Sequence, residues 1–120
     1  MTTDFYDEEV TIDEEVRAAL DGQILNWENV TSQKLFGGAG YFVIEKVFAI
    51  LLEGVVAMSL PDELRARSLT LAGVSPFISP SGGEEFSRWV QFVLLLPEDI
   101  SAVTPWIQAA YNQVSAHDEV

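Results

Sequence analysis

The chain has 120 residues, 48% of them hydrophobic, and its 19 acidic and six basic residues give a net charge of −13. This length is typical of one domain, and the apolar content is sufficient for a folded core. The absence of cysteine excludes disulfides, thiolate metal sites and a cysteine nucleophile.

The acidic residues are concentrated at the start of the chain. Residues 1–15 contain seven of them and no base, and removing those seven from −13 leaves −6 for the remainder. The six bases are scattered, so no basic face is expected to replace the counterions of DNA or RNA. The start also lacks the basic and apolar regions of a secretion signal, and the longest apolar run, 47–52, is too short for a bilayer. The sequence predicts a cytoplasmic protein with no direct nucleic-acid binding and no membrane segment.

Residues 1–10 are predicted to be a mobile acidic tail, and residues 11–116 a single domain. A helix is expected over 11–26, because Val16, Leu20 and Ile24 recur at helical spacing. Thr11 is the expected cap, with Glu14 completing a capping box.

Short runs rich in β-branched and aromatic residues fill 30–60, and they predict a meander of antiparallel hairpins. Turns are expected at Gly37-Gly38, around Ile44–Lys46 and at Glu53-Gly54. A second helix is predicted over 61–73, followed by a polar loop at 79–85.

The strand predicted over 86–95 is apolar on both faces. Such a strand lies either at the centre of a sheet or against another subunit, so Trp89, Val93 and Leu95 are candidate interface residues. A last helix is expected from Thr104 and Pro105. The element order predicts an α+β domain of two layers, with an antiparallel sheet of about five strands and helices on one face.

Few residues of the sequence are candidates for catalysis or metal binding. His117 is the only histidine and lies near the C-terminus, and the adjacent acid pairs fit helix starts and loops. No spacing of His, Asp and Glu is typical of a metal site. We therefore expect no catalytic residue, no metal, no cofactor and no enzymatic activity.

The stretch LFGGAGYF, residues 35–42, has the glycine content of a phosphate-binding loop. A P-loop requires a following Lys-Ser/Thr and a helix, whereas a strand-like run, YFVI, follows here. The dinucleotide pattern requires a third glycine where Val43 stands. A structural turn or bulge is the favoured interpretation, and a backbone-approach site for a ligand or partner is the alternative.

The segments VTSQKLFGGAGYFV and KVFAILLEGVVAMSL resemble the N-terminal domain of the TfoX/Sxy family of bacterial competence regulators. The later AGVSPF, LLPED and Trp106 are similar to further landmarks of that family, so the resemblance covers roughly 16–116. It implies a two-layer fold related to secretion chaperones, with structural motif residues Phe36, Gly37, Gly38, Gly40, Phe48 and Ala49. Two family positions differ, because Gln33 replaces an arginine and Ser59 replaces a lysine.

Three functions remain open at this point. The resemblance implies a non-enzymatic regulatory or adaptor domain that acts through protein contacts, as a homodimer or with a protein partner. The acidity and the implied fold also suit a chaperone-like dimer that binds a protein client. A small-ligand domain would use the 35–42 turn, with a pocket lined by Tyr41, Phe42 or Trp89.

Overall fold

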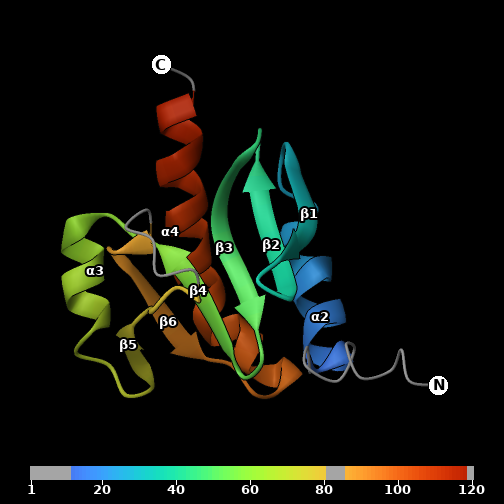
Figure 1. Ribbon diagram of the computed structural model, residues 1–120, viewed down its shortest axis with the longest axis horizontal. Helices are drawn as coiled ribbons and strands as arrows, with labels where there is room; N and C mark the ends of the chain where they lie inside the picture. Colours follow the sequence, from blue (N-terminus) through green and yellow to red (C-terminus); the bar gives the residue numbers. More distant parts are fainter. Residues whose placement is uncertain (1–11, 81–85, 119–120) are drawn as a thin grey trace.

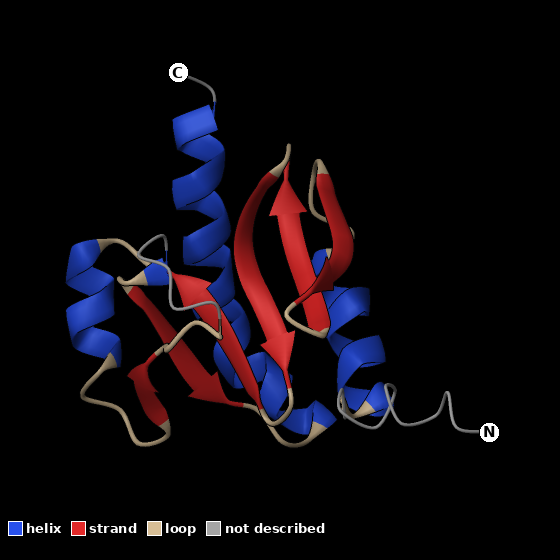
Figure 2. Ribbon diagram, viewed as in Figure 1, coloured by secondary structure: helices blue, strands red, loops and turns tan. Residues whose placement is uncertain are grey.

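An antiparallel sheet forms the centre of the molecule (Figures 1 and 2). The structure is a computed structural model that describes residues 12–80 and 86–118. Its helices are α2 (Glu14–Ile24), α3 (Asp62–Ser68), the 3-10 turn η2 (Pro97–Asp99) and α4 (Ile100–Asp118). Its strands are β1 (Val30–Leu35), β2 (Gly38–Val43), β3 (Lys46–Leu52), β4 (Val55–Ser59), β5 (Val74–Pro76) and β6 (Trp89–Val93).

The strand order in the sheet is β1-β2-β3-β4-β6-β5, and every neighbouring pair is antiparallel. Two-residue turns join the first four strands, since Leu35 pairs with Gly38, Val43 with Lys46, and Leu52 with Val55. The predicted α+β class and the meander are confirmed. Within the described residues the sheet has six strands rather than about five.

Helices α2 and α4 cover one face of the sheet, with α4 passing behind β4 in Figure 1. Helix α2 buries Val16, Leu20 and Ile24, which lie on one side because they are four residues apart. The same core contains side chains from α4 and the sheet: Val103, Ile107, Ala110, Tyr41, Phe48, Met58, Val90 and Phe92. No helix of the described residues is long and apolar enough to cross a membrane.

An aromatic segment, and not a helix, covers part of the other face. Phe77 and Phe86 pack with Trp89 over Ile50 and Ala57. The rings of Phe86 and Trp89 meet edge to face with centroids 4.9 Å apart, a favoured aromatic geometry. The chain after β5, drawn in yellow in Figure 1, crosses in front of β4 to form this cover.

The first helix differs from the prediction of 11–26. It begins at Glu14, because the carboxylate of Asp13 accepts hydrogen bonds from the amides of Glu15 and Val16 at 2.8 and 3.3 Å. The predicted capping box of Thr11 and Glu14 is therefore wrong, and aspartate is at least as good a cap as threonine. Thr11 itself and the predicted tail 1–10 lie outside the described residues.

Helix α3 is shorter than the predicted 61–73. It ends at Ser68, where the hydroxyls of Ser68 and Thr70 donate to the carbonyls of Arg65 and Arg67. These hydroxyls bond to carbonyls near the helix end and so compete with the backbone amides that would continue the helix. Gly73, with φ +82°, leads instead into β5, a strand that the sequence did not predict. Residues 81–85 of the predicted 79–85 loop lie outside the described residues.

Helix α4 begins four residues before the predicted Thr104. The 3-10 turn at Pro97–Asp99 leads directly into it, and the carboxylate of Asp99 accepts from the amide of Leu96 at 3.3 Å. Pro105 therefore lies inside the helix, where the Thr104 hydroxyl donates to the Ile100 carbonyl. The helix also continues through His117 to Asp118, past the expected frayed end.

Candidate functional site

The stretch 35–42 forms a tight hairpin, as the favoured interpretation predicted. Strands β1 and β2 are joined by Phe36 and Gly37, whose φ angles are +55° and +80°. The turn was predicted at Gly37-Gly38, but Gly38 is already the first residue of β2 and its φ is not positive. The reason for glycine there is proximity, since a Cβ on Gly38 would lie 2.1 Å from the Leu51 carbonyl oxygen. Gly40 is similarly confined, with Leu35 and Phe42 side chains 3.0–3.1 Å from such a Cβ.

Phe48 and Ala49 both face the helix-covered core because β3 contains a bulge. The register shifts so that Tyr41 pairs with Ala49 and Phe42 with Val47, which leaves Phe48 as the extra residue. Its ring stacks on Trp27 with centroids 6.4 Å apart and meets Tyr111 at 5.5 Å. The bulge thereby links the sheet to α4 and to the turn that follows α2.

The three candidate interface residues lie in two different environments. Trp89 is only 6% exposed, because Phe77 and Phe86 of the same chain cover it. Val93 and Leu95 are 49% and 58% exposed on the same side of the extended chain. A protein partner could therefore reach Val93 and Leu95 without rearranging the aromatic cluster.

A groove of about 400 Å³ adjoins Val93 at the β5 edge of the sheet. We call it the apolar groove, and its walls are Leu71, Gly73, Val74, Phe92, Val93, Ala102, Val103 and Trp106, with Ala72 and Asp99. Leu71 is 42% exposed. Asp99 gives the groove an acidic rim, and the exposed Glu98 lies beside it.

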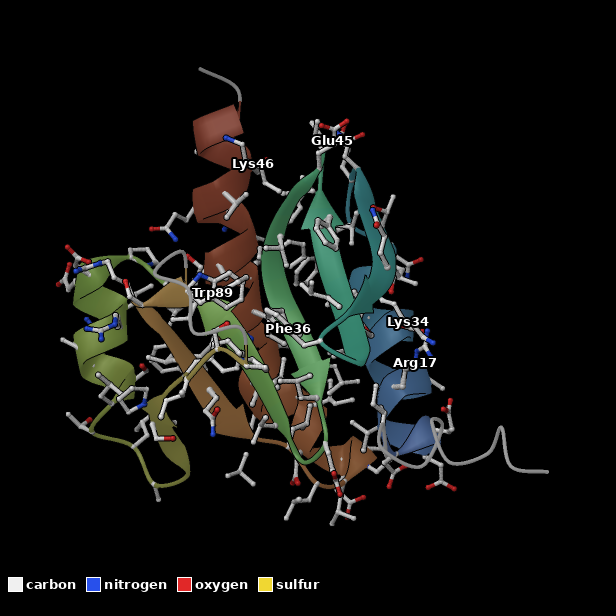
Figure 3. All side chains as sticks on the ribbon, viewed as in Figure 1. Arg17, Lys34, Phe36, Glu45, Lys46 and Trp89 are labelled. Atoms are coloured by element: carbon white, nitrogen blue, oxygen red, sulfur yellow. The ribbon has the colours of Figure 1, made fainter. Side chains whose placement is uncertain are left out.

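A second hollow, of about 450 Å³, lies where β4 ends, beside the C-terminal half of α4. We call it the polar cleft. Its apolar walls come from Val47, Leu60, Trp89 and Val114, and its polar ones from Lys46, Ser59, Asp62, Ser87, Arg88 and Gln113. In Figure 3, Lys46 lies at the start of β3, next to the C-terminal half of α4.

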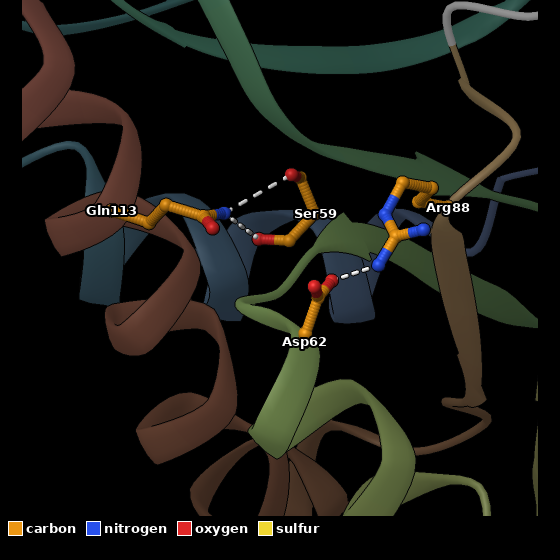
Figure 4. Close-up of polar contacts among 4 residues, drawn as sticks. All are labelled: Ser59, Asp62, Arg88 and Gln113. Atoms are coloured by element: carbon orange, nitrogen blue, oxygen red, sulfur yellow. Dashed lines mark hydrogen bonds and ion pairs between the residues drawn. The ribbon is translucent and has the colours of Figure 1, made fainter.

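Hydrogen bonds and an ion pair connect the walls of the polar cleft (Figure 4). The amide nitrogen of Gln113 donates to the Ser59 carbonyl at 3.1 Å and to its hydroxyl at 3.2 Å. On the opposite side, the Arg88 guanidinium is paired with the Asp62 carboxylate. The lining thus contains two bases, Lys46 and Arg88, and one acid, Asp62.

One buried ionisable group lies outside both hollows. Tyr41 is fully buried, and its hydroxyl donates to the Asp21 carboxylate at 2.6 Å. Burial raises the pKa of Tyr41 well above its ordinary value, and the bond to Asp21 raises it further. Of the three residues named for a ligand pocket, Tyr41 and Phe42 line neither hollow, whereas Trp89 is among the lining residues of the polar cleft.

Within residues 12–80 and 86–118 no group of three His, Asp or Glu side chains is placed to hold a metal ion. The sequence did not indicate the polar cleft, because Asp62 and Arg88 are 26 residues apart. It also did not indicate the groove, whose walls come from three separate segments.

The described residues thus form an α+β domain with an antiparallel sheet and one helix-covered face, and the apolar groove and the polar cleft are hollows on its surface. Comparison of the chain with known protein families, with curated proteins and with solved structures found no match.

Proposed function

We propose that the protein is a non-enzymatic regulatory or adaptor domain of the TfoX/Sxy N-terminal type, which acts by binding another protein. The resemblance of residues 16–116 to that family motivates the regulatory role. The observation that carries the binding role is the apolar groove, with Leu71 and Val93 left exposed on its walls. Exposed apolar surface rimmed by polar groups is typical of protein interaction sites.

The chemistry of the groove selects the kind of partner. Asp99 lies on its wall and Glu98 next to it, while the whole chain carries −13. A basic partner would be attracted by this charge, and its apolar side chains would fill a hollow of about 400 Å³. A basic amphipathic helix supplies both features on one face, so we assign the groove to such a segment.

The same charges disfavour a second copy of the chain as the occupant. Two molecules at −13 repel each other, and each would present an acidic rim to the other. The experiment therefore has to distinguish binding of a basic partner from the alternative, a chaperone-like dimer in which a second copy fills the groove. No observation favours a ligand at the 35–42 turn, where Gly38 and Gly40 are closed in by neighbouring atoms.

Isothermal titration with a synthetic leucine–lysine helical peptide tests the proposal. Binding should weaken at least about tenfold in Val93→Lys and Leu71→Lys, because each variant puts a cation into the contact. Ile44→Lys is the matched control, since Ile44 is 56% exposed at the β2–β3 turn, away from the groove. A leucine–glutamate peptide should not bind.

Equal weakening by all three variants would contradict the proposal. Sedimentation velocity supplies the second arm, in which the wild-type protein should remain a monomer. A dimer that Val93→Lys dissociates would show that a second copy fills the groove, and the basic partner would then be wrong.

A further inference from the structure

The two edges of the sheet differ in the backbone groups that they leave free. At the β5 edge, Gly73 and Phe77 take part in the hydrogen bonds to β6. Val74 and Pro76, which alternate with them, therefore face outward. The Val74 amide already donates to the Leu71 carbonyl at 3.3 Å, and proline has no N–H. Among the described residues, this edge thus has no free amide for an added strand.

Strand β1 forms the opposite edge, and its outward amides are free. Leu35 and Gly38 close a two-residue turn, which makes them a hydrogen-bonded pair. The bonding to β2 alternates from there, so Gln33 bonds to β2, whereas Ser32 and Lys34 direct their N–H and C=O groups outward. No hydrogen bond in the described part of the chain occupies these outward groups. Strand β1 is therefore the open edge of the sheet.

Lys34 places a positive charge beside these free groups. Its side chain is exposed and forms no ion pair with an acid of the described residues. Val30, on the same side of β1, packs into the helix-covered core, so Lys34 lies on the side of α2, where Figure 3 also shows Arg17. At physiological salt, charges more than about 8 Å apart are largely screened, so the distant acids of the chain affect this edge little. An acidic side chain on an added strand would meet an unpaired ammonium group here.

The alternate residues of β1 present a different surface. Thr31, Gln33 and Leu35 lie on the face of the sheet away from α2, and Leu35 packs against the aromatic cluster over Ile50. β-Branched side chains on a neighbouring strand pack well beside such residues. An extended peptide in which acidic and β-branched residues alternate therefore complements both sides of this edge.

We propose that the β1 edge is a strand-addition site for an extended segment of a partner protein, in which acidic residues alternate with β-branched ones. Main-chain hydrogen bonds to Ser32 and Lys34 supply the affinity, and the Lys34 side chain selects the acid. A second copy of the chain is a poor occupant, because two molecules of charge −13 repel each other. The site is separate from the apolar groove and does not depend on the helix assigned to it.

Amide hydrogen exchange with a capped peptide of alternating valine and glutamate tests this site. The Ser32 and Lys34 amides should exchange rapidly in the protein alone and at least about tenfold more slowly when the peptide is bound. The Thr31 and Gln33 amides, which bond to β2, should be protected in both samples. A valine–lysine peptide should give no protection. The valine–glutamate peptide with methylated backbone nitrogens should give none either, because it has the same side chains and no amide donors.

Two variants separate the backbone contribution from that of the charge. Ser32→Pro removes one outward amide without breaking a bond to β2, and it should weaken peptide binding at least about tenfold. Ser32→Ala keeps the amide and should bind as the wild type does. Lys34→Glu should weaken binding about three- to fivefold, and it tests the site even where Ser32→Pro does not fold. Arg67→Glu, an exposed charge reversal on α3, is its matched control.

Equal protection by the valine–lysine or the methylated peptide would contradict this site. Slow exchange of Ser32 and Lys34 in the protein alone would do so too, since the chain itself would then occupy the edge. No protection by any peptide would mean that Lys34 only guards the edge against pairing. Val93→Lys should leave binding at the edge unchanged, which keeps this result distinct from failure of the apolar groove.

Discussion

The hydroxyl of buried Tyr41 on β2 donates a 2.6 Å hydrogen bond to the Asp21 carboxylate on α2. Asp21 is also paired with Arg17, one helical turn earlier, at 3.8 Å. A phenol in an apolar core needs a hydrogen-bond acceptor, and the helix brings one to it. This contact joins the first helix to the sheet at a point where the rest of the packing is apolar.

Replacing Tyr41 with phenylalanine removes this bond and keeps the ring. We expect Tyr41→Phe to lower the free energy of unfolding by about 1.5 kcal/mol, because the acceptor is charged. Tyr111→Phe should cost less than about 1 kcal/mol, since its hydroxyl donates to the Glu28 carbonyl at the surface. Urea denaturation of both variants measures the difference. Equal losses would show that the Tyr41 bond has no special contribution.

The raised pKa of Tyr41 predicts a loss of stability in alkaline solution. The folded state holds the phenol proton more tightly than the unfolded chain, where the pKa is about 10. Its contribution is therefore complete below pH ~10 and declines above that value, by up to about 1.4 kcal/mol per pH unit. Unfolding curves between neutral pH and pH ~11.5 should fall more steeply for the wild type than for Tyr41→Phe. If stability fell equally with pH in the wild type and in Tyr41→Phe, ionisation of Tyr41 would not be the cause of the alkaline loss.

Replacement by alanine should change the free energy of unfolding in opposite directions at two glycines. In Gly38→Ala the new Cβ would meet the Leu51 carbonyl oxygen, so we expect a loss of at least about 2 kcal/mol. Gly22 lies on the exposed side of α2, and in Gly22→Ala the Cβ meets nothing within 4 Å, so we expect a gain of about 0.5–1 kcal/mol. Thermal and urea unfolding distinguish the two. A tolerated Gly38→Ala would mean that β2 and β3 are not so closely apposed.

The β2–β3 turn places two non-glycine residues, Ile44 and Glu45, at φ +48° and +73°. A β-branched side chain is strained in this region, and Asn-Gly is the preferred pair for such a turn. The double change Ile44→Asn and Glu45→Gly should therefore raise stability by about 1–2 kcal/mol. Glu53→Asn is the control, because Gly54 already supplies the positive φ at the next turn. A loss in the double variant would indicate that Ile44 contributes packing.

Much of the architecture followed from local patterns in the sequence. The three turns of the meander were located by glycine content or by a break between apolar runs, and all three join paired strands. The stripe of Val16, Leu20 and Ile24 identified the buried face of α2. The misplaced helix ends share one cause, which is side-chain hydrogen bonding to the backbone. The carboxylates of Asp13 and Asp99 accept such bonds and the Ser68 hydroxyl donates one, and the helix boundaries lie there and not at Thr11, Gly73 and Pro105.

The surface features could not be predicted in the same way. Strand β5 is three residues long and ends in proline, so pairing with β6 defines it more than its own residues do. The aromatic cover over Trp89 brings Phe77 and Phe86 together from either side of 81–85. Likewise the Asp62–Arg88 pair and the groove walls depend on distant segments that only the folded chain brings together.

The most direct test of the protein-binding role is a methyl and indole NMR titration with the leucine–lysine peptide. The account predicts that the methyl signals of Leu71, Val93 and Val103 and the indole of Trp106 shift together as peptide is added. The methyls of Ile24, in the core, and of Ile44, at the far turn, should not move. Shifts confined to other surfaces, or no shifts at all, would contradict the assignment of the apolar groove as the partner site.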